Sequence, residues 1–180
     1  SLVRSLRTDV RADLPGGVRA VCSGGVLSLQ TRADAVPFAP WEPVALQMEG
    51  ETCTPGGILF ASSDRKKIPE GREETPLFVC AFSRTTLAGA LVRTRRPGDR
   101  IRPTRGSGSR TLKRFLIDRK VPVAVRDRLP LIAVSSEIAW IPGVSGALPF
   151  EWPQDRAPGG DCVWIAYRPD AGIADAFLLP

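Results

Sequence analysis

Short apolar runs separated by proline- and glycine-rich turns dominate this chain, and they predict a strand-rich fold. Three runs are expected to be β-strands: 57–62 (GILFAS), 77–82 (LFVCAF) and 162–167 (CVWIAY). We expect the second of them to be a central strand, because it is almost wholly apolar. Two hairpins are predicted, one at 18–31 with its turn at Ser23-Gly24-Gly25 and one at 131–141 with its turn at Ser135-Ser136.

Helical periodicity marks the segment that follows residue 110. Leu112, Phe115 and Leu116 recur at positions i, i+3 and i+4, which predicts a short helix with this face buried. Pro122 is expected to end the helix, since the residue before a proline is pushed toward extended angles. A second short helical turn is predicted at 123–128.

Composition places the chain among globular proteins. It has 180 residues, of which 43% are hydrophobic, enough for one core or two small ones. No apolar run reaches the roughly 18 residues of a membrane-spanning helix, so we expect none. The first residues lack the apolar segment of a signal peptide, and the only methionine is Met48. We therefore expect a C-terminal piece of a longer protein.

Positive charge is concentrated between Arg93 and Arg128. This window holds thirteen Arg or Lys against three Asp, a net +10, whereas the whole chain carries +6. Lys113 and Lys120 are seven residues apart, so a helix would place them within about 20° of each other, off the apolar stripe. A concentrated basic patch indicates a polyanionic partner. The alternative is a solvated basic face with no ligand.

Cysteine and histidine usage argues against metal and nucleophile chemistry. Histidine is absent, which excludes Ser-His and Cys-His pairs. Cys22, Cys53, Cys80 and Cys162 stand far apart with no C-x-x-C, unlike the paired spacing of zinc sites. Cys22 and Cys80 lie in apolar runs and are expected to be buried thiols of a reducing, cytoplasmic compartment.

Carboxylates offer little chemistry either. Asp99, Asp118 and Asp127 are each set among arginines, which favours ion pairing over acid–base catalysis. We therefore expect this chain not to be catalytic by itself.

A turn and the residues around it carry a resemblance to a known family. Pro97-Gly98 fits a type II turn, and Asp99 follows it. The string 93–101 (RTRRPGDRI) resembles the opening of the C-terminal domain of tRNA(Ile)-lysidine synthetases (the TilS family). Further matches follow at family spacing up to Gly143: Leu112-Lys113, Ile117-Asp118, Lys120-Val121-Pro122, Arg126-Asp127-Arg128, Pro130-Leu131 and Trp140-Ile141-Pro142-Gly143. The chain departs from the family at Arg110-Thr111, where paired lysines are common.

The resemblance implies a fold and a function. The fold would be α+β, a strand-rich, layered β-sandwich-like core with few short helices, similar to a domain of phenylalanyl-tRNA synthetase. The parent enzyme would be an ATP-dependent ligase that attaches lysine to the wobble cytidine of an isoleucine tRNA with a CAU anticodon. ATP and Mg would be used by an N-terminal catalytic domain, with no cofactor in this segment. Expected partners are tRNA, held near its acceptor stem, that catalytic domain, and a second copy through the rest of the enzyme.

Residue roles follow from the resemblance and from the charge. We expect the following residues to bind tRNA: Arg93, Arg95, Arg96, Arg102, Arg110, Lys113, Arg114 and Lys120. We expect the following to form the structural motif: Pro97, Gly98, Asp99, Leu112, Phe115, Asp118, Pro122, Arg126, Asp127 and Pro130. Arg100 beside Asp99, and Arg126 and Arg128 flanking Asp127, are expected to brace the fold.

Three sequence segments are expected: a strand-rich part at 1–91, the basic motif segment with its turn, helix and hairpin at 92–143, and an unrecognised extension with one strand at 144–180. Ser23 to Ser28 (SGGVLS) differs at one position from S-G-G-x-D-S, the pyrophosphate loop of the family's ATP-binding domain. Leu27 replaces the aspartate that a metal–nucleotide site needs as an oxygen ligand. We therefore favour a hairpin there.

Two alternatives to tRNA recognition stay open: binding of another nucleic acid, for instance a single strand, and docking on an acidic protein surface. Single-strand binders stack bases on exposed aromatic rings. The basic window contains one aromatic residue, Phe115, on the predicted apolar face. Contact with the phosphates of a double-stranded stem therefore fits this sequence better.

Overall fold

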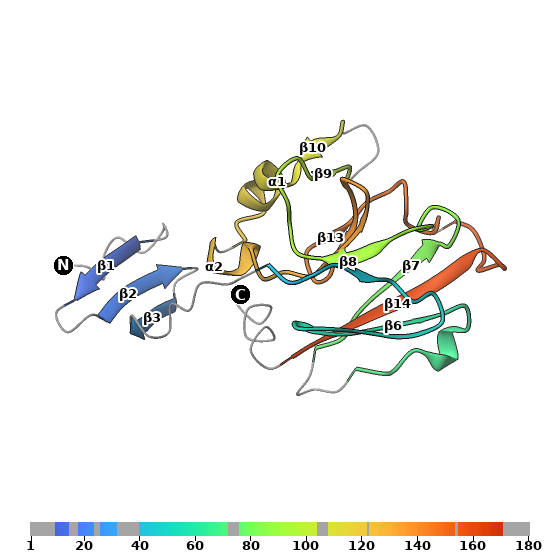
Figure 1. The fold of residues 1–180 in the computed structure, drawn as a ribbon, viewed down its shortest axis with the longest axis horizontal. Coiled ribbons are helices and arrows are strands. Elements are labelled where there is room, and N and C mark those ends of the chain that lie inside the picture. The colour runs from blue at the N-terminus through green and yellow to red at the C-terminus, as the bar shows by residue number, and fades with distance from the viewer. Residues whose placement is uncertain are drawn as a thin grey trace. The chain divides into compact units, whose positions relative to one another are not determined.

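The structure is a computed structural model that describes residues 10–14, 18–23, 26–31, 40–71, 76–103, 108–121, 123–153 and 155–170. The chain separates into two compact units, which are described here one at a time (Figure 1). Unit 1 comprises Ser1–Ala39 with Leu178–Pro180, and unit 2 comprises Pro40–Phe177.

Unit 1 contains a three-stranded antiparallel sheet in the order β1-β2-β3. The strands are β1 (Val10–Leu14), β2 (Val18–Ser23) and β3 (Val26–Thr31). Ser23 pairs with Val26, so the chain turns here between two strands, and the predicted hairpin is confirmed. The hydrophobic pattern of the sequence does not predict β1.

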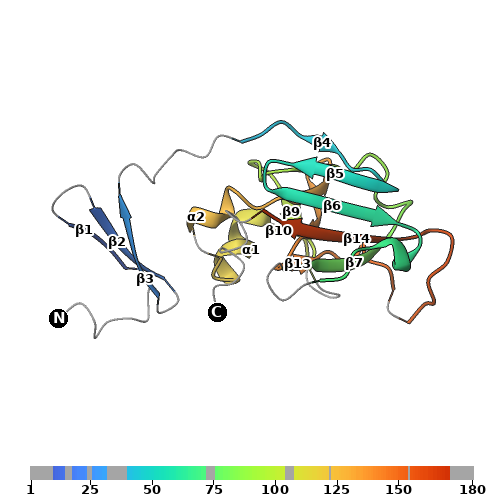
Figure 2. The same cartoon turned by 90° about the horizontal axis from the view of Figure 1, so that it is seen from below.

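A four-stranded antiparallel sheet forms one layer of unit 2 (Figure 2). Its order is β5 (Gly50–Thr54), β6 (Gly57–Ser62), β14 (Cys162–Pro169) and β7 (Phe78–Ser83). The three predicted strands are all present. The prediction that the 77–82 run is central is wrong, because β7 ends the order and β14 lies between β6 and β7. Of the apolar side chains of β7, Phe82 is fully buried in the core, Phe78 and Cys80 are partly buried, and Val79 is exposed. An apolar run can therefore form a strand at the end of the sheet order with one face packed on the core.

The second layer is a mixed seven-stranded sheet in the order β10-β9-β12-β11-β8-β4, with β13 paired to β12. Its strands are short: β4 (Val44–Ala45), β8 (Leu91–Arg93), β9 (Arg100–Ile101), β10 (Arg110–Thr111), β11 (Leu131–Val134), β12 (Glu137–Ile141) and β13 (Ser145–Gly146). The β11–β12 pair confirms the second predicted hairpin. The helical elements are α1 (Leu112–Asp118), α2 (Val123–Arg126) and the 3-10 turn η2 (Arg65–Lys67).

The two layers of unit 2 share one hydrophobic core. Phe82 of β7 meets Trp140 of β12 with ring centroids 5.7 Å apart. Tyr167 of β14 is fully buried, and its hydroxyl donates to the Gly56 carbonyl at 2.5 Å. This arrangement confirms the expected α+β, layered and strand-rich fold with few short helices.

Strands from all three expected sequence segments pack in unit 2, because β6, β12 and β14 contribute to the same core. The division at residues 91/92 and 143/144 stays a prediction about the sequence. In the part of the chain described, no helix has the length and apolar character needed to cross a membrane.

Candidate nucleic-acid interface

The predicted turn opens the motif segment. The Asp99 N–H donates to the Arg96 carbonyl at 3.3 Å, and Gly98 has φ 91°, the left-handed angle that a type II turn needs at this position. The Asp99 carboxylate also accepts the Arg96 N–H at 2.7 Å, which closes the turn from inside. The roles predicted for Gly98 and Asp99 are therefore local and structural.

Arg93 pairs with Asp99 inside the protein. Arg93 Nη1 and Nη2 donate to Asp99 Oδ2 and Oδ1 at 2.8 and 2.7 Å, and the two side chains are only 3% and 2% exposed. We expected Arg93 to bind tRNA, and this burial corrects that expectation. The sequence places Arg93 among exposed arginines, but its position on β8 directs its side chain into the interior.

The Arg93 guanidinium also holds two backbone carbonyls. It donates to the Thr94 carbonyl at 3.0 Å and to the Ser135 carbonyl at 2.9 Å. Ser135 lies in the β11–β12 turn with φ 56°, in the left-handed region. One buried arginine therefore ties the turn at 96–99 to the turn of the hairpin.

The Arg93–Asp99 pair and the two turns that it joins form a frame, and helix α1 packs on this frame. Leu112, Phe115 and Leu116 are buried at 1%, 3% and 0% exposure, as predicted, and Lys113 is exposed. The Leu112 N–H donates to the Asp99 carbonyl at 2.8 Å, so the helix starts directly from the turn residue. The predicted helix face is confirmed.

The helix ends at Asp118, earlier than Pro122, which lies outside the described residues. The Lys120 N–H donates to the Ile117 carbonyl at 2.9 Å, and the Val121 N–H donates to the Leu116 carbonyl at 3.0 Å. This is the hydrogen-bond pattern of a Schellman motif, in which glycine usually occupies the left-handed position. Here Lys120 occupies it with φ 56° and an exposed side chain.

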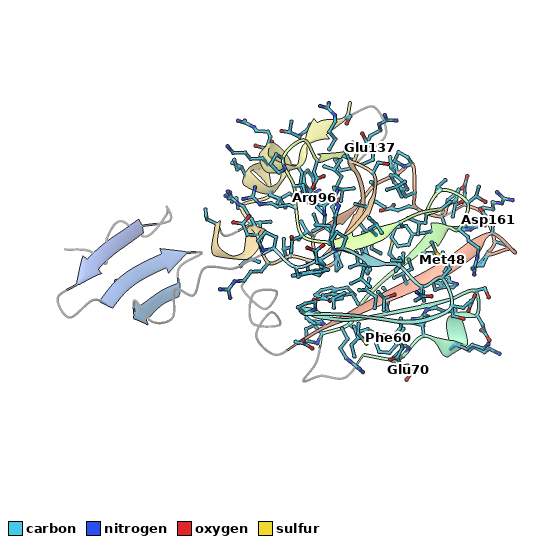
Figure 3. All side chains as sticks on the ribbon, viewed as in Figure 1. Met48, Phe60, Glu70, Arg96, Glu137 and Asp161 are labelled. Atoms are coloured by element: carbon cyan, nitrogen blue, oxygen red, sulfur yellow. The ribbon has the colours of Figure 1, made fainter. Side chains whose placement is uncertain are left out.

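The remaining predicted cations surround this frame. Arg96, Arg102, Arg110 and Arg114 are exposed, and Arg95 is half-buried. Strand pairing joins Arg110 of β10 to Ile101 of β9, and α1 contacts both strands, so these cations belong to one small substructure. In Figure 3, Arg96 lies toward this end of unit 2, whereas Phe60 and Glu70 lie toward the opposite edge.

Two further arginines belong to the same surface and were not predicted as binding residues. Arg119 is exposed and stacks over the Phe115 ring at 5.4 Å. Arg100 was expected to brace the fold. Its side chain is exposed because the register of β9 turns it outward, and it donates to the Ser109 hydroxyl and carbonyl at 2.9 and 3.0 Å.

The two other aspartates of the segment pair with surface arginines. Arg95 Nε lies 2.5 Å from Asp127 Oδ1. Asp118 lies 3.0 Å from Arg114 Nε and 3.7 Å from an Arg110 nitrogen. Arg126 does not use the adjacent Asp127: it donates to the Val121 carbonyl at 2.7 Å and so braces the end of α1, which agrees with the bracing role expected for it. The other predicted motif prolines, Pro97 and Pro130, are exposed and buried respectively.

Two of the thiols, Cys80 and Cys162, are poor candidates for chemistry. Burial raises the pKa of Cys80 to about 12, and burial also raises the pKa of Cys162. Cys53 is exposed, Cys80 is half-buried, and the Cys22 side chain lies outside the described residues. Within the described ranges, no three His, Cys, Asp or Glu side chains form a group that could hold a metal ion.

Comparison with known proteins identifies the motif. The profile of the TilS substrate C-terminal domain family matches residues 91–162. A crystal structure of a TilS C-terminal domain superposes with a TM-score of 0.51 over 72% of this chain and 97% of that one, at 23% identity. The chain belongs to the family of TilS C-terminal domains.

Two proteins named tRNA(Ile)-lysidine synthase match this chain beyond the motif segment. The tRNA(Ile)-lysidine synthase of Symbiobacterium thermophilum is 34% identical over 174 residues, which is 91% of this chain and 31% of that protein. The Bacillus subtilis protein of the same name is 38% identical over 140 residues, 73% of this chain and 29% of that protein. The chain therefore spans less than a third of the length of these relatives.

Proposed function

We propose that this chain is the tRNA-binding C-terminal region of a tRNA(Ile)-lysidine synthase. The observation that carries the proposal is the cluster of exposed cations on β9, β10 and α1, built on the buried Arg93–Asp99 frame that the family motif encodes. A concentrated basic surface of this kind attracts a polyanion.

The whole enzyme would use ATP and Mg to join free lysine to the wobble cytidine of an isoleucine tRNA with a CAU anticodon, in the cytoplasm. That chemistry would take place in an N-terminal domain outside this chain. The name of the relatives supports the assignment, and the activity, the substrate and a homodimeric enzyme are proposals for this protein.

We further propose that the surface contacts phosphates of the tRNA acceptor stem. Arginine forks suit bidentate phosphate contacts, and lysines act as point charges. The one aromatic ring of the basic window, Phe115, is buried, so this window offers no exposed ring on which an unpaired base could stack. Duplex phosphates fit these side chains better than splayed bases.

The test uses two lysines whose removal should leave the fold intact. Lys113→Ala removes an exposed cation, and Lys120→Gly removes another while placing glycine where the backbone favours it. We expect the double variant to bind tRNA more weakly and with a shallower salt dependence. Each lost phosphate contact should flatten the plot of log affinity against log salt by about 0.9, the value for B-form DNA.

The matched control is Lys66→Ala with Lys67→Ala. Both lysines are exposed on η2, outside the basic segment, and their loss changes the net charge by the same amount. It should leave the tRNA affinity and the salt slope near wild type. Equal effects of the two double variants would reject a specific surface. No effect of either would favour docking on an acidic protein instead.

A further inference from the structure

Two arginines of the basic surface, the half-buried Arg95 and the exposed Arg114, each pair with an aspartate through Nε. Asp127 Oδ1 accepts a hydrogen bond from Arg95 Nε, and Asp118 Oδ1 forms an ion pair with Arg114 Nε. Among the described residues, no hydrogen bond engages Nη1 or Nη2 of either arginine, and Nε is the nitrogen that lies nearest the aspartate in each pair. Arg93 differs, since its Nη atoms are the ones that bind Asp99.

In this geometry, the Nη1 and Nη2 groups of Arg95 and Arg114 stay available to bind a phosphate. Arginine carries five N–H donors in a rigid plane, and its two Nη groups together can grip two phosphate oxygens. An aspartate on Nε fixes the plane of the fork and restricts its rotamers before RNA arrives. Arg95 and Arg114 are therefore pre-oriented for a bidentate contact.

Stability does not explain the Asp118 pair. Asp118 is the last residue of α1, where a negative charge is unfavourable to the helix dipole. It follows Arg114 by four residues, and an arginine placed before its acid is the weaker order for such a pair. Exposed pairs of this kind contribute little to folding in any case.

The same carboxylates repel RNA that is badly placed. A polyanion held only by diffuse attraction brings its phosphates close to Asp118 and Asp127 and gains no bidentate contact in return. An RNA whose phosphates reach the Nη1 and Nη2 groups gains a bidentate contact with each arginine. These contacts offset the repulsion between its phosphates and the two aspartates. The aspartates therefore disfavour the first kind of RNA more than the second.

We propose that Asp118 and Asp127 are positioning residues that set the selectivity of the basic surface for structured tRNA over unstructured RNA. The inference rests on the proposed function of this surface. It assigns to the two aspartates a role distinct from bracing the fold.

The test compares tRNA with poly(U), an unstructured polyanion, at one fixed salt concentration. For the double variant Asp118→Asn with Asp127→Asn, we expect affinity for poly(U) to rise by roughly two- to fivefold per substitution, the scale of an exposed ion pair. Affinity for tRNA should rise less or fall, so the ratio of the two affinities drops severalfold. Thermal unfolding should stay near wild type.

A matched control separates placement from net charge. Glu70→Gln with Asp155→Asn removes the same two negative charges from exposed positions outside the basic segment, and Figure 3 shows Glu70 toward the edge of unit 2 opposite Arg96. This control should raise both affinities slightly and leave their ratio unchanged. The variant Asp118→Glu with Asp127→Glu keeps the charges but shifts the carboxylates. It should weaken tRNA binding while affinity for poly(U) stays low.

An unchanged ratio in the double Asn variant, or an equal drop in the control, overturns the inference. If Lys113→Ala with Lys120→Gly weakens tRNA binding while the ratio stays constant in the Asn variant, only the inference fails. If the lysine variant binds tRNA like wild type, the proposed surface fails and the inference fails with it.

Discussion

Removal of the buried Arg93–Asp99 pair should show how much the motif contributes to folding. Arg93→Ala deletes four hydrogen bonds and leaves the Asp99 carboxylate buried, with the Arg96 N–H as its remaining donor in the described structure. Breaking a buried ion pair by removing one partner costs about 3–5 kcal/mol. We expect a loss in this range, since both side chains are at most 3% exposed.

Urea unfolding followed by tryptophan fluorescence reports the stability of unit 2, because all four tryptophans fall within Pro40–Phe177. With a denaturant slope of about 2 kcal/mol per molar, a loss of 4 kcal/mol lowers the urea midpoint by about 2 M. Arg93→Lys should recover only part of the loss, since an ammonium keeps the charge but not the fork.

The double variant Arg93→Ala with Asp99→Ala should lose less stability than the two single variants combined, because no unpaired charge stays buried. Arg96→Ala, an exposed neighbour, is the control and should change stability by about 0.5 kcal/mol or less. A cost below about 1 kcal/mol for Arg93→Ala would refute the account of Arg93 as the organiser of the motif.

Three further changes test the packing and the charges of unit 2. Phe115→Ala should cost roughly 3–5 kcal/mol, whereas Ile117→Ala, at an exposed position of the same helix, should cost below about 1 kcal/mol by the same urea assay. The Ser63 backbone N–H and further hydrogen bonds lower the pKa of Glu49 from 4.5 to about 2. The ionised Glu49 carboxylate therefore contributes to the free energy of unfolding above pH 4.5, and this contribution is lost as the pH falls toward 2. Glu49→Gln should therefore flatten the dependence of the urea midpoint on pH in that window, and an unchanged slope would contradict this. Gly57→Ala should cost about 3 kcal/mol, because φ is 142° and a Cβ would lie 2.3 Å from the Arg168 carbonyl oxygen. A thermal melt within a degree of wild type would show that the close approach is relieved.

Local chemistry was readable from the sequence alone. The buried face of α1, the Pro97-Gly98 turn and the hairpins at 18–31 and 131–141 were predicted because each depends on residues a few positions apart. The family resemblance rested on the same local strings, and the matched profile over 91–162 confirms it.

The tertiary structure decided which charges are available and which strand is central. Arg93 and Arg95 stand two residues apart in a basic string, yet one is buried on Asp99 and the other reaches Asp127, 32 residues away. The choice of ion-pair partner, like the place of β14 between β6 and β7, depends on which distant segments the fold brings together. Charge patterns along a chain do not record burial, because the same arginine can face solvent or the core depending on the strand that carries it.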